Sequence, residues 1–140
     1  MADQNLVKEK IRNIQEYMNE IKSILVLPDA DIVHTVEKLR TLERNFQLIV
    51  DEMLDINIHL IKELNLESPD DFQSTFEILG EHNILPKDFA YKIAPVVGLR
   101  NKIVHRYEII DRTLFVNAFK NNYKDFEELL RLIREYLDKC

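Results

Sequence analysis

Apolar residues recur at helical spacing through the first part of the chain. From Val7 onward they step by four and three residues, at Val7, Ile11, Ile14, Met18, Ile21 and Leu25. Such a stripe is typical of a helix that packs along one side. Proline disfavours helical backbone at the residue before it, and Leu27-Pro28 interrupts the pattern. The sequence therefore predicts a first helix that stops at this point.

A second apolar stripe continues without glycine or proline until Pro69. Its members are Ile32, Val36, Leu39, Leu42, Phe46, Ile49, Met53, Ile56 and Leu60. Asp29 or Asp31 is suited to cap the start of this helix. We expect the longest helix of the protein here, over roughly residues 30 to 64, packed antiparallel on the first.

Shorter elements are predicted in the next part of the chain. Ser68-Pro-Asp-Asp71 places a capping hydroxyl before a proline and an acid, which favours the start of a third helix. Asn83 is expected to end it in a left-handed cap. Pro86 opens a fourth helix, and Pro95 in its middle predicts a kink or a restart between Ala94 and Gly98.

The C-terminal part carries two apolar runs, at Leu114, Phe115, Ala118 and Phe119, and at Phe126, Leu129, Leu130, Ile133 and Leu137. Asp111 is expected to cap the first run, and Asn121-Asn122 is a candidate interruption between the two. Together the elements predict an all-α, antiparallel bundle of about five helices. A chain of 140 residues, 46% hydrophobic, suits one core, so residues 1–140 are expected to form a single domain.

Composition narrows the possible partners. The formal net charge of −6 argues against broad electrostatic attraction to nucleic acid, so any contact with RNA has to be local. A local concentration of cations is provided by Arg100, Lys102, Arg106 and Arg112, diluted by Glu108 and Asp111. The only cysteine, Cys140, excludes an intramolecular disulfide. Because neither a signal-peptide pattern nor a membrane-length apolar run occurs, we expect a cytoplasmic protein without a membrane partner.

The densest polar cluster spans Gly98 to Tyr107. Arg100 supplies a permanent cation whose planar fork suits phosphate oxygens, and His105 belongs to the residue type that exchanges protons near neutral pH. Asn101 lies four residues before His105, so the amide can orient the imidazole. On a regular helix Arg100 and His105 are offset by roughly 140° at about 100° per residue. Either the helix ends near His105, or two copies of the motif meet across a symmetric dimer.

The pattern Arg100-Asn101-x-x-x-His105-x-Tyr107, followed by Ile110-Asp111, resembles the HepT-like branch of the HEPN superfamily, as does the upstream segment from Leu42 to His59. The resemblance covers almost the whole chain. It implies an all-helical, homodimeric ribonuclease toxin encoded beside a minimal nucleotidyltransferase antitoxin. It also implies that the antitoxin transfers AMP to Tyr107.

Two functions are compatible with the motif. In the first, the 2′-hydroxyl of RNA attacks the phosphate without a metal or cofactor; His105 moves a proton, Arg100 stabilises the charged phosphoryl oxygens, and Asn101 orients the imidazole or contacts the RNA. A homodimer would then bring paired motifs to one cleft. In the second, the chain is a non-catalytic helical adaptor that binds a nucleotide or a nucleotidyltransferase. Arginine and histidine also favour helix C-termini for purely structural reasons.

Other polar residues give weaker indications. Asp55 and His59, four residues apart, are candidates for a second polar pair near the site, or for an ordinary ion pair; Lys102 and Arg106 are candidate supporting cations. Asp31-x-x-His34 resembles half of a carboxylate-histidine metal motif. A four-helix di-metal site needs two Glu-x-x-His units and two further glutamates, and no such set is present. We therefore expect no metal site.

Overall fold

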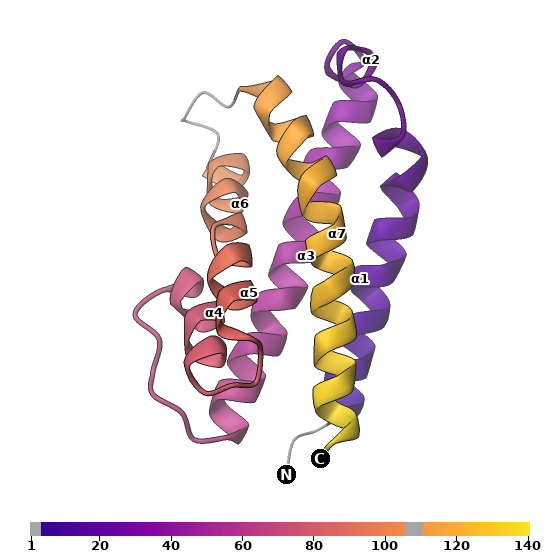
Figure 1. Cartoon of the computed structure of the whole chain (residues 1–140). Coiled ribbons are helices and arrows are strands. Elements are labelled where there is room, and N and C mark those ends of the chain that lie inside the picture. The colour runs from indigo at the N-terminus through magenta and orange to yellow at the C-terminus, as the bar shows by residue number, and fades with distance from the viewer. Residues whose placement is uncertain (1–3, 106–110) are drawn as a thin grey trace.

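The computed structural model describes residues 4–105 and 111–140, and these residues form helices and short connections (Figure 1). The helices of this part are α1 (Gln4–Leu25), α2 (Asp29–Val33), α3 (Val36–Glu63), α4 (Phe72–Glu81), α5 (Lys87–Ile93), α6 (Val96–His105) and α7 (Arg112–Asp138). The all-α class predicted from the apolar periodicity is confirmed. No helix in the described part is both long enough and apolar enough to cross a membrane.

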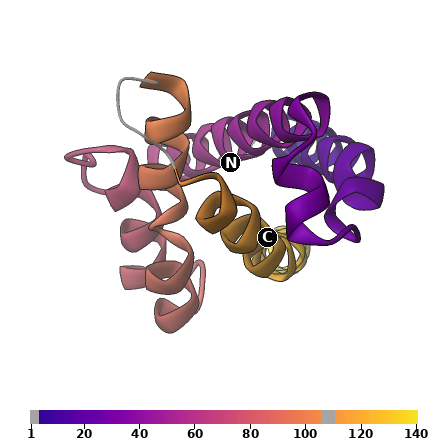
Figure 2. The same ribbon diagram turned by 90° about the horizontal axis from the view of Figure 1, so that it is seen from above.

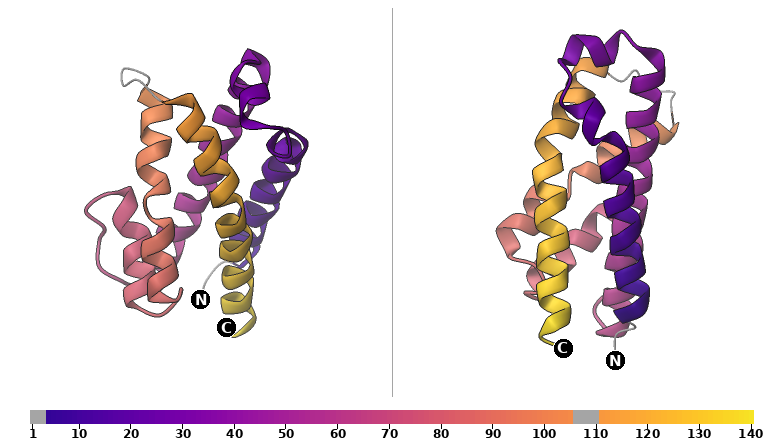
Figure 3. Two further views of the ribbon diagram at one scale, coloured as in Figure 1. Left: turned by 45° about the horizontal axis from the view of Figure 1, so that its top comes forward. Right: turned by 90° about the vertical axis from the view of Figure 1, so that its right-hand side faces the viewer.

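Three long helices form the main body of the fold. α1 runs antiparallel to α3, as expected, and α7 lies beside α1 (Figures 1 and 3). The predicted stripe of α1 is buried at Val7, Ile11, Ile14, Met18 and Ile21. At the centre, Phe46 of α3 contacts Phe115, Phe119 and Phe126 of α7, with ring centroids 5.6, 5.0 and 5.9 Å away. Aromatic contacts of this kind add to the stabilisation from burial alone.

The predicted helix from 30 to 64 is divided in two. α2 ends at Val33, Thr35 is extended with φ −115° and ψ 102°, and α3 begins at Val36. Ile32 is fully buried, as its place in the apolar stripe predicts. The predicted cap is wrong, because neither Asp29 nor Asp31 caps α2 through its side chain. α2 packs on α7, where Lys120 donates to the Leu27 carbonyl oxygen and pairs with Asp29. This tertiary contact accounts for the break between α2 and α3, where the sequence has neither glycine nor proline.

The start of α4 lies three residues later than Pro69 would place it. Asp71 is the N-cap: its Oδ1 accepts from the Ser74 N–H at 2.8 Å, while Ser74 Oγ accepts from the Asp71 N–H at 3.2 Å. This reciprocal capping box satisfies two backbone donors and overrides the Ser68 alternative. The other end agrees with the prediction, because Asn83 has φ 62° and the Ile84 N–H donates to the Leu79 oxygen at 3.0 Å.

α4, α5 and α6 lie on the side of α3 away from α1 (Figures 1 and 2). α5 stops at Ile93 and α6 restarts at Val96, so the predicted break at Pro95 is confirmed. Within this group α4 and α5 approach very closely, because a Cβ on Gly80 would lie only 2.6 Å from the Cβ of Ala90. The short helices are thus a tightly packed group that places α6 against α3.

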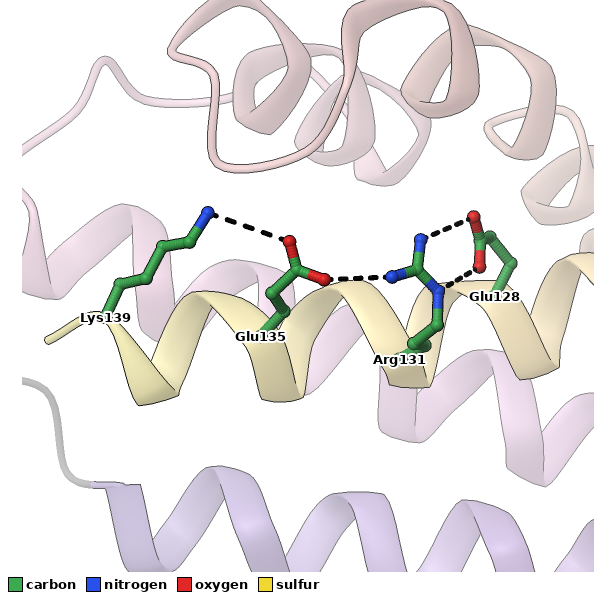
Figure 4. A network of polar contacts seen from close by, with 4 residues as sticks. All are labelled: Glu128, Arg131, Glu135 and Lys139. Carbon is green, nitrogen blue, oxygen red and sulfur yellow. Dashed lines mark hydrogen bonds and ion pairs between the residues drawn. The ribbon is translucent and has the colours of Figure 1, made fainter.

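α7 is continuous, so the interruption considered at Asn121-Asn122 does not occur. The buried rings of Phe119 and Phe126 on either side hold this part of the helix on α3. Asp111 caps the start as predicted, its Oδ1 accepting from the Leu114 N–H at 3.1 Å. Figure 4 shows the exposed face of the last turns, where charged residues spaced by three or four pair in a row: Glu128, Arg131, Glu135 and Lys139. The pairing with Arg131 lowers the pKa of Glu128.

Candidate functional site

The polar motif lies on α6, which restarts after Pro95 and continues to His105. Val96, Val97 and Ile103 are buried and fix the helix on the core. His105 is exposed and is the last described residue of α6. Whether the helix ends near His105, as one of the two interpretations from the sequence requires, lies outside the described residues. Since α6 is unbroken between Arg100 and His105, their angular offset of roughly 140° still applies.

Arg100 is held by two hydrogen bonds. Its Nε donates to Asp51 Oδ1 on α3 at 2.7 Å, and its Nη1 donates to the side-chain oxygen of Asn101 at 3.2 Å. The Arg100 side chain is only 20% exposed and that of Asp51 34%. A bond between two charged groups at this distance is of the strong, charge-assisted kind. Arg100 is therefore fixed in direction, while part of its side chain still reaches the surface.

Asp51 is a component of this cluster that the sequence analysis did not single out. It lies 49 residues before Arg100, so no local spacing connects them. One feature could have indicated Asp51: it is an acid in a stretch of α3 where Val50, Met53 and Leu54 are all buried. A charge in such a stretch generally has a partner.

The second polar pair considered from the sequence, between Asp55 and His59, does not form. Asp55 Oδ2 instead accepts from Lys10 Nζ of α1 at 3.1 Å, and this contact raises the pKa of Lys10. His59 Nε2 lies 3.9 Å from Glu63 Oε1. The permanent charge of a lysine on the adjacent helix attracts the carboxylate more strongly than an imidazole can. Asp55 therefore belongs to the α1–α3 contact and has no direct link to Arg100.

The face of α6 that carries His105 is open. Gly98, Lys102 and His105 project within about 60° of one another, as follows from their helical spacing, and all three are exposed. Among residues 4–105 and 111–140, and apart from the neighbouring helix backbone, a Cβ at Gly98 would meet nothing within 4 Å. Lys102 is thus available as the supporting cation predicted from the sequence. Arg106 and Tyr107 lie outside the described residues.

The described residues also bear on metal binding. Within 4–105 and 111–140, no three residues of the His, Cys, Asp and Glu types gather closely enough to hold a metal ion. The polar groups that α6 does present are a guanidinium, an amide, an ammonium and an imidazole. These groups suit anion binding and proton transfer.

Comparisons with known proteins give independent information on the function of the chain. The family model of HepT-like ribonucleases matches residues 14–133. A tRNA nuclease HepT from Aphanizomenon flos-aquae is 30% identical over 133 residues, covering 94% of this chain and 90% of that protein. An mRNA nuclease HepT from Shewanella oneidensis is 24% identical over 131 residues, covering 91% and 90%.

The fold also matches a solved structure closely. The tri-AMPylated Shewanella oneidensis HEPN toxin, in complex with its MNT antitoxin, superimposes with a TM-score of 0.86. The match covers 96% of this chain and 99% of the toxin at 21% identity. With a family model that matches most of its length and a relative 30% identical over nearly all of it, the chain belongs to the HepT-like ribonuclease family.

Proposed function

We propose that this chain is the ribonuclease toxin of a toxin–antitoxin pair and that it cuts RNA without a metal. The observation that carries the proposal is the arrangement on α6, where a guanidinium fixed by Asp51 and Asn101 precedes an exposed histidine five residues later on the same helix. Family membership supports the reaction type. The relatives named as nucleases of tRNA and of mRNA point to cellular RNA as the substrate, and hence to action in the cytoplasm.

In the proposed reaction, the 2′-oxygen of a ribose attacks the adjacent phosphorus and the bond to the 5′-oxygen breaks. The products are a 2′,3′-cyclic phosphate and a 5′-hydroxyl. His105 takes the proton from the 2′-hydroxyl, or delivers one to the leaving 5′-oxygen. Arg100 stabilises the charge that gathers on the phosphoryl oxygens. Asn101, which accepts a hydrogen bond from Arg100, helps to fix the cation and remains the proposed partner of the imidazole.

The active form is proposed to be a homodimer. One copy of α6 directs Arg100 toward α3 and carries His105 at an angle of roughly 140° to it, so a single copy does not aim both at one phosphate. A two-fold axis beside the open face of α6 would place two motifs around one cleft. One His105 then acts as the base and the other as the acid. An isolated monomer is expected to be inactive.

The proposed partner is a minimal nucleotidyltransferase antitoxin, as in the complex of the Shewanella oneidensis toxin. It would transfer AMP from ATP to the hydroxyl of Tyr107, releasing pyrophosphate. The adduct adds negative charge and bulk two residues from His105, which repels RNA and fills the phosphate site. Neutralisation would then need no change of fold.

Cleavage of RNA in excess chelator tests the catalytic proposal. The purified chain is expected to cut a bulk tRNA preparation in EDTA, and His105→Ala and Arg100→Ala are expected to lose cleavage while remaining folded. His82→Ala is the matched control, because His82 is also an exposed histidine and its pair with Glu67, at 2.7 Å, is remote in sequence from the motif. Cleavage that a divalent ion restores after chelation would overturn the mechanism. Absence of cleavage by the wild-type chain would favour the non-catalytic adaptor, and full cleavage by His105→Ala would overturn the catalytic role of His105.

Intact-protein mass spectrometry tests the modification. Co-expression with the nucleotidyltransferase is expected to add one or more adenylates at Tyr107 and to abolish cleavage. Tyr107→Phe is expected to stay unmodified and active. Adducts on Tyr17, Tyr91, Tyr123 or Tyr136 instead would show that the motif tyrosine is not the acceptor.

A further inference from the structure

The ion pair between Arg100 and Asp51 differs from the other arginine pairs of the described residues. Arg40 pairs with Glu43 and Arg131 with Glu128 and Glu135, in each case three or four residues away on the same helix. Those two arginine side chains are more than half exposed. Arg100 instead reaches from α6 to α3 and is mostly buried. The ion pair with Asp51 therefore fixes the guanidinium of α6 from the longer helix α3.

The geometry of the bond determines which part of the guanidinium remains available. Arginine has five N–H donors. Nε donates to Asp51 and Nη1 uses one of its hydrogens on Asn101, so the three that remain are all on the terminal nitrogens. Bidentate binding of a phosphoryl group needs two parallel N–H donors on one edge. With Nε engaged, the donors left for a ligand are the two hydrogens of Nη2 and the second hydrogen of Nη1.

We propose that Asp51 is a positioning residue of the ribonuclease site: by holding Nε, it orients Arg100 so that the terminal nitrogens receive the phosphoryl group. This inference rests on the proposed function. An arginine without such an anchor would sample many side-chain conformations, and small displacements of a group that contacts the transition state reduce the rate strongly. Asp51 itself does not touch the substrate.

Two substitutions separate orientation from charge. Asp51→Ala removes the acceptor and is expected to lower kcat for bulk tRNA on the order of 100-fold. Asp51→Asn keeps an acceptor oxygen on the same carbon and removes the charge, so it is expected to retain cleavage to within several-fold of the wild type. A smaller change in KM than in kcat is expected for Asp51→Ala, because the loss concerns the aim of Arg100 at the transition state.

Asp125→Ala is the matched control. Asp125 is an aspartate on the long helix α7 whose Oδ1 pairs with Lys92 Nζ of α5 at 3.2 Å, so it also joins a long helix to a short one. Both alanine variants are expected to show a similar, small fall in melting temperature. Cleavage should fall only in Asp51→Ala. Equal loss of cleavage in both variants would indicate a merely structural role and overturn the inference.

Chemical rescue provides a readout that a structural role would not change. Arg100→Ala is expected to regain part of its cleavage when guanidinium is added at millimolar, non-denaturing concentration, because Asp51 still binds the free cation in the vacated place. In Arg100→Ala with Asp51→Ala the rescue should be absent. Equal rescue in both backgrounds, or wild-type cleavage by Asp51→Ala beside an inactive Arg100→Ala, overturns the role of Asp51 alone. If Arg100→Ala cleaves like the wild type, the proposed function fails, and this inference with it.

Discussion

The two halves of the molecule are built differently. α1, α3 and α7 have 22, 28 and 27 residues and bury continuous apolar stripes, whereas α4, α5 and α6 have 10, 7 and 10 residues. Both glycines of the chain and two of its prolines, Pro86 and Pro95, lie in or between the short helices. Helices this short are marginal in isolation and depend on tertiary packing. The three long helices therefore provide stability. The short helices carry the motif, and their own stability depends on packing.

The sharpest test of this division is the aromatic cluster of the long half. Phe46→Ala is expected to lower the free energy of unfolding by about 3–5 kcal/mol, because it removes a buried ring that contacts three others. Urea denaturation followed by circular dichroism measures it. Phe72→Ala is the control in the short half, since the Phe72 side chain is 51% exposed and should matter little. Equal losses for both would contradict the comparison.

A second test concerns the close approach inside the short half. Gly80→Ala is expected to lower the free energy of unfolding by about 1–3 kcal/mol, because the added methyl would overlap the Ala90 side chain. Shortening the opposing residue in Gly80→Ala with Ala90→Gly should relieve the overlap. The double variant is then more stable than Gly80→Ala, as a thermal unfolding series can show. If the double variant instead lost further stability, by the sum of the two single losses, the contact between Gly80 and Ala90 would not limit the packing of α4 on α5.

The two capping aspartates compare the halves directly. Asp71→Ala and Asp111→Ala each remove one N-cap acceptor, at an expected cost of about 1 kcal/mol. We expect the larger loss for Asp71, since α4 has 10 residues and a reciprocal capping box, while the long α7 can lose its first turn and keep the remainder. Chemical denaturation of the two variants side by side decides the order. A larger loss at Asp111 would show that the start of α7 is the weaker point.

The smallest effect is expected at the open face of α6. Gly98→Ala should raise the free energy of unfolding by about 0.5–1 kcal/mol, because alanine favours helix and its methyl meets no group of the described residues outside its own stretch of helix. The measurement belongs at low protein concentration, where assembly contributes little. A loss of stability there would reveal crowding on this face. A loss of cleavage despite the gain would indicate close contact with a second copy in the active form.

The sequence predicted those parts of the fold whose cause is local. The stripe of α1, the break at Pro95, the left-handed Asn83 and the Asp111 cap all follow from neighbouring residues. The break before α3 was missed because Ile32 and Val36 continue the apolar spacing across it, while its cause is the packing of α2 on α7. At α4 several polar residues in succession offered alternative caps, and only the reciprocal bonding of Asp71 and Ser74 selects one.

The same limit applies to the candidate site. The enzyme class expected from the motif, an endoribonuclease, is confirmed by the family match, and α6 does carry Arg100, Asn101 and His105. The roles of these residues and of Tyr107 stay predictions. The partner of Arg100 was out of reach, because a contact across 49 residues leaves no periodic signal. Asp55 and His59 show the converse, since suitable spacing on one helix did not make them partners.

The bond between Arg100 and Asp51 has a consequence for ionic strength. Proteins that bind nucleic acid through many cations release counterions, and their affinity falls by about 10³–10⁵ between 50 and 200 mM salt. Here the motif arginine is already balanced by a carboxylate at 2.7 Å, in a chain of formal net charge −6. Binding of RNA should therefore displace few counterions. The proposed ribonuclease should therefore lose less activity with rising salt than a protein that binds nucleic acid through many cations.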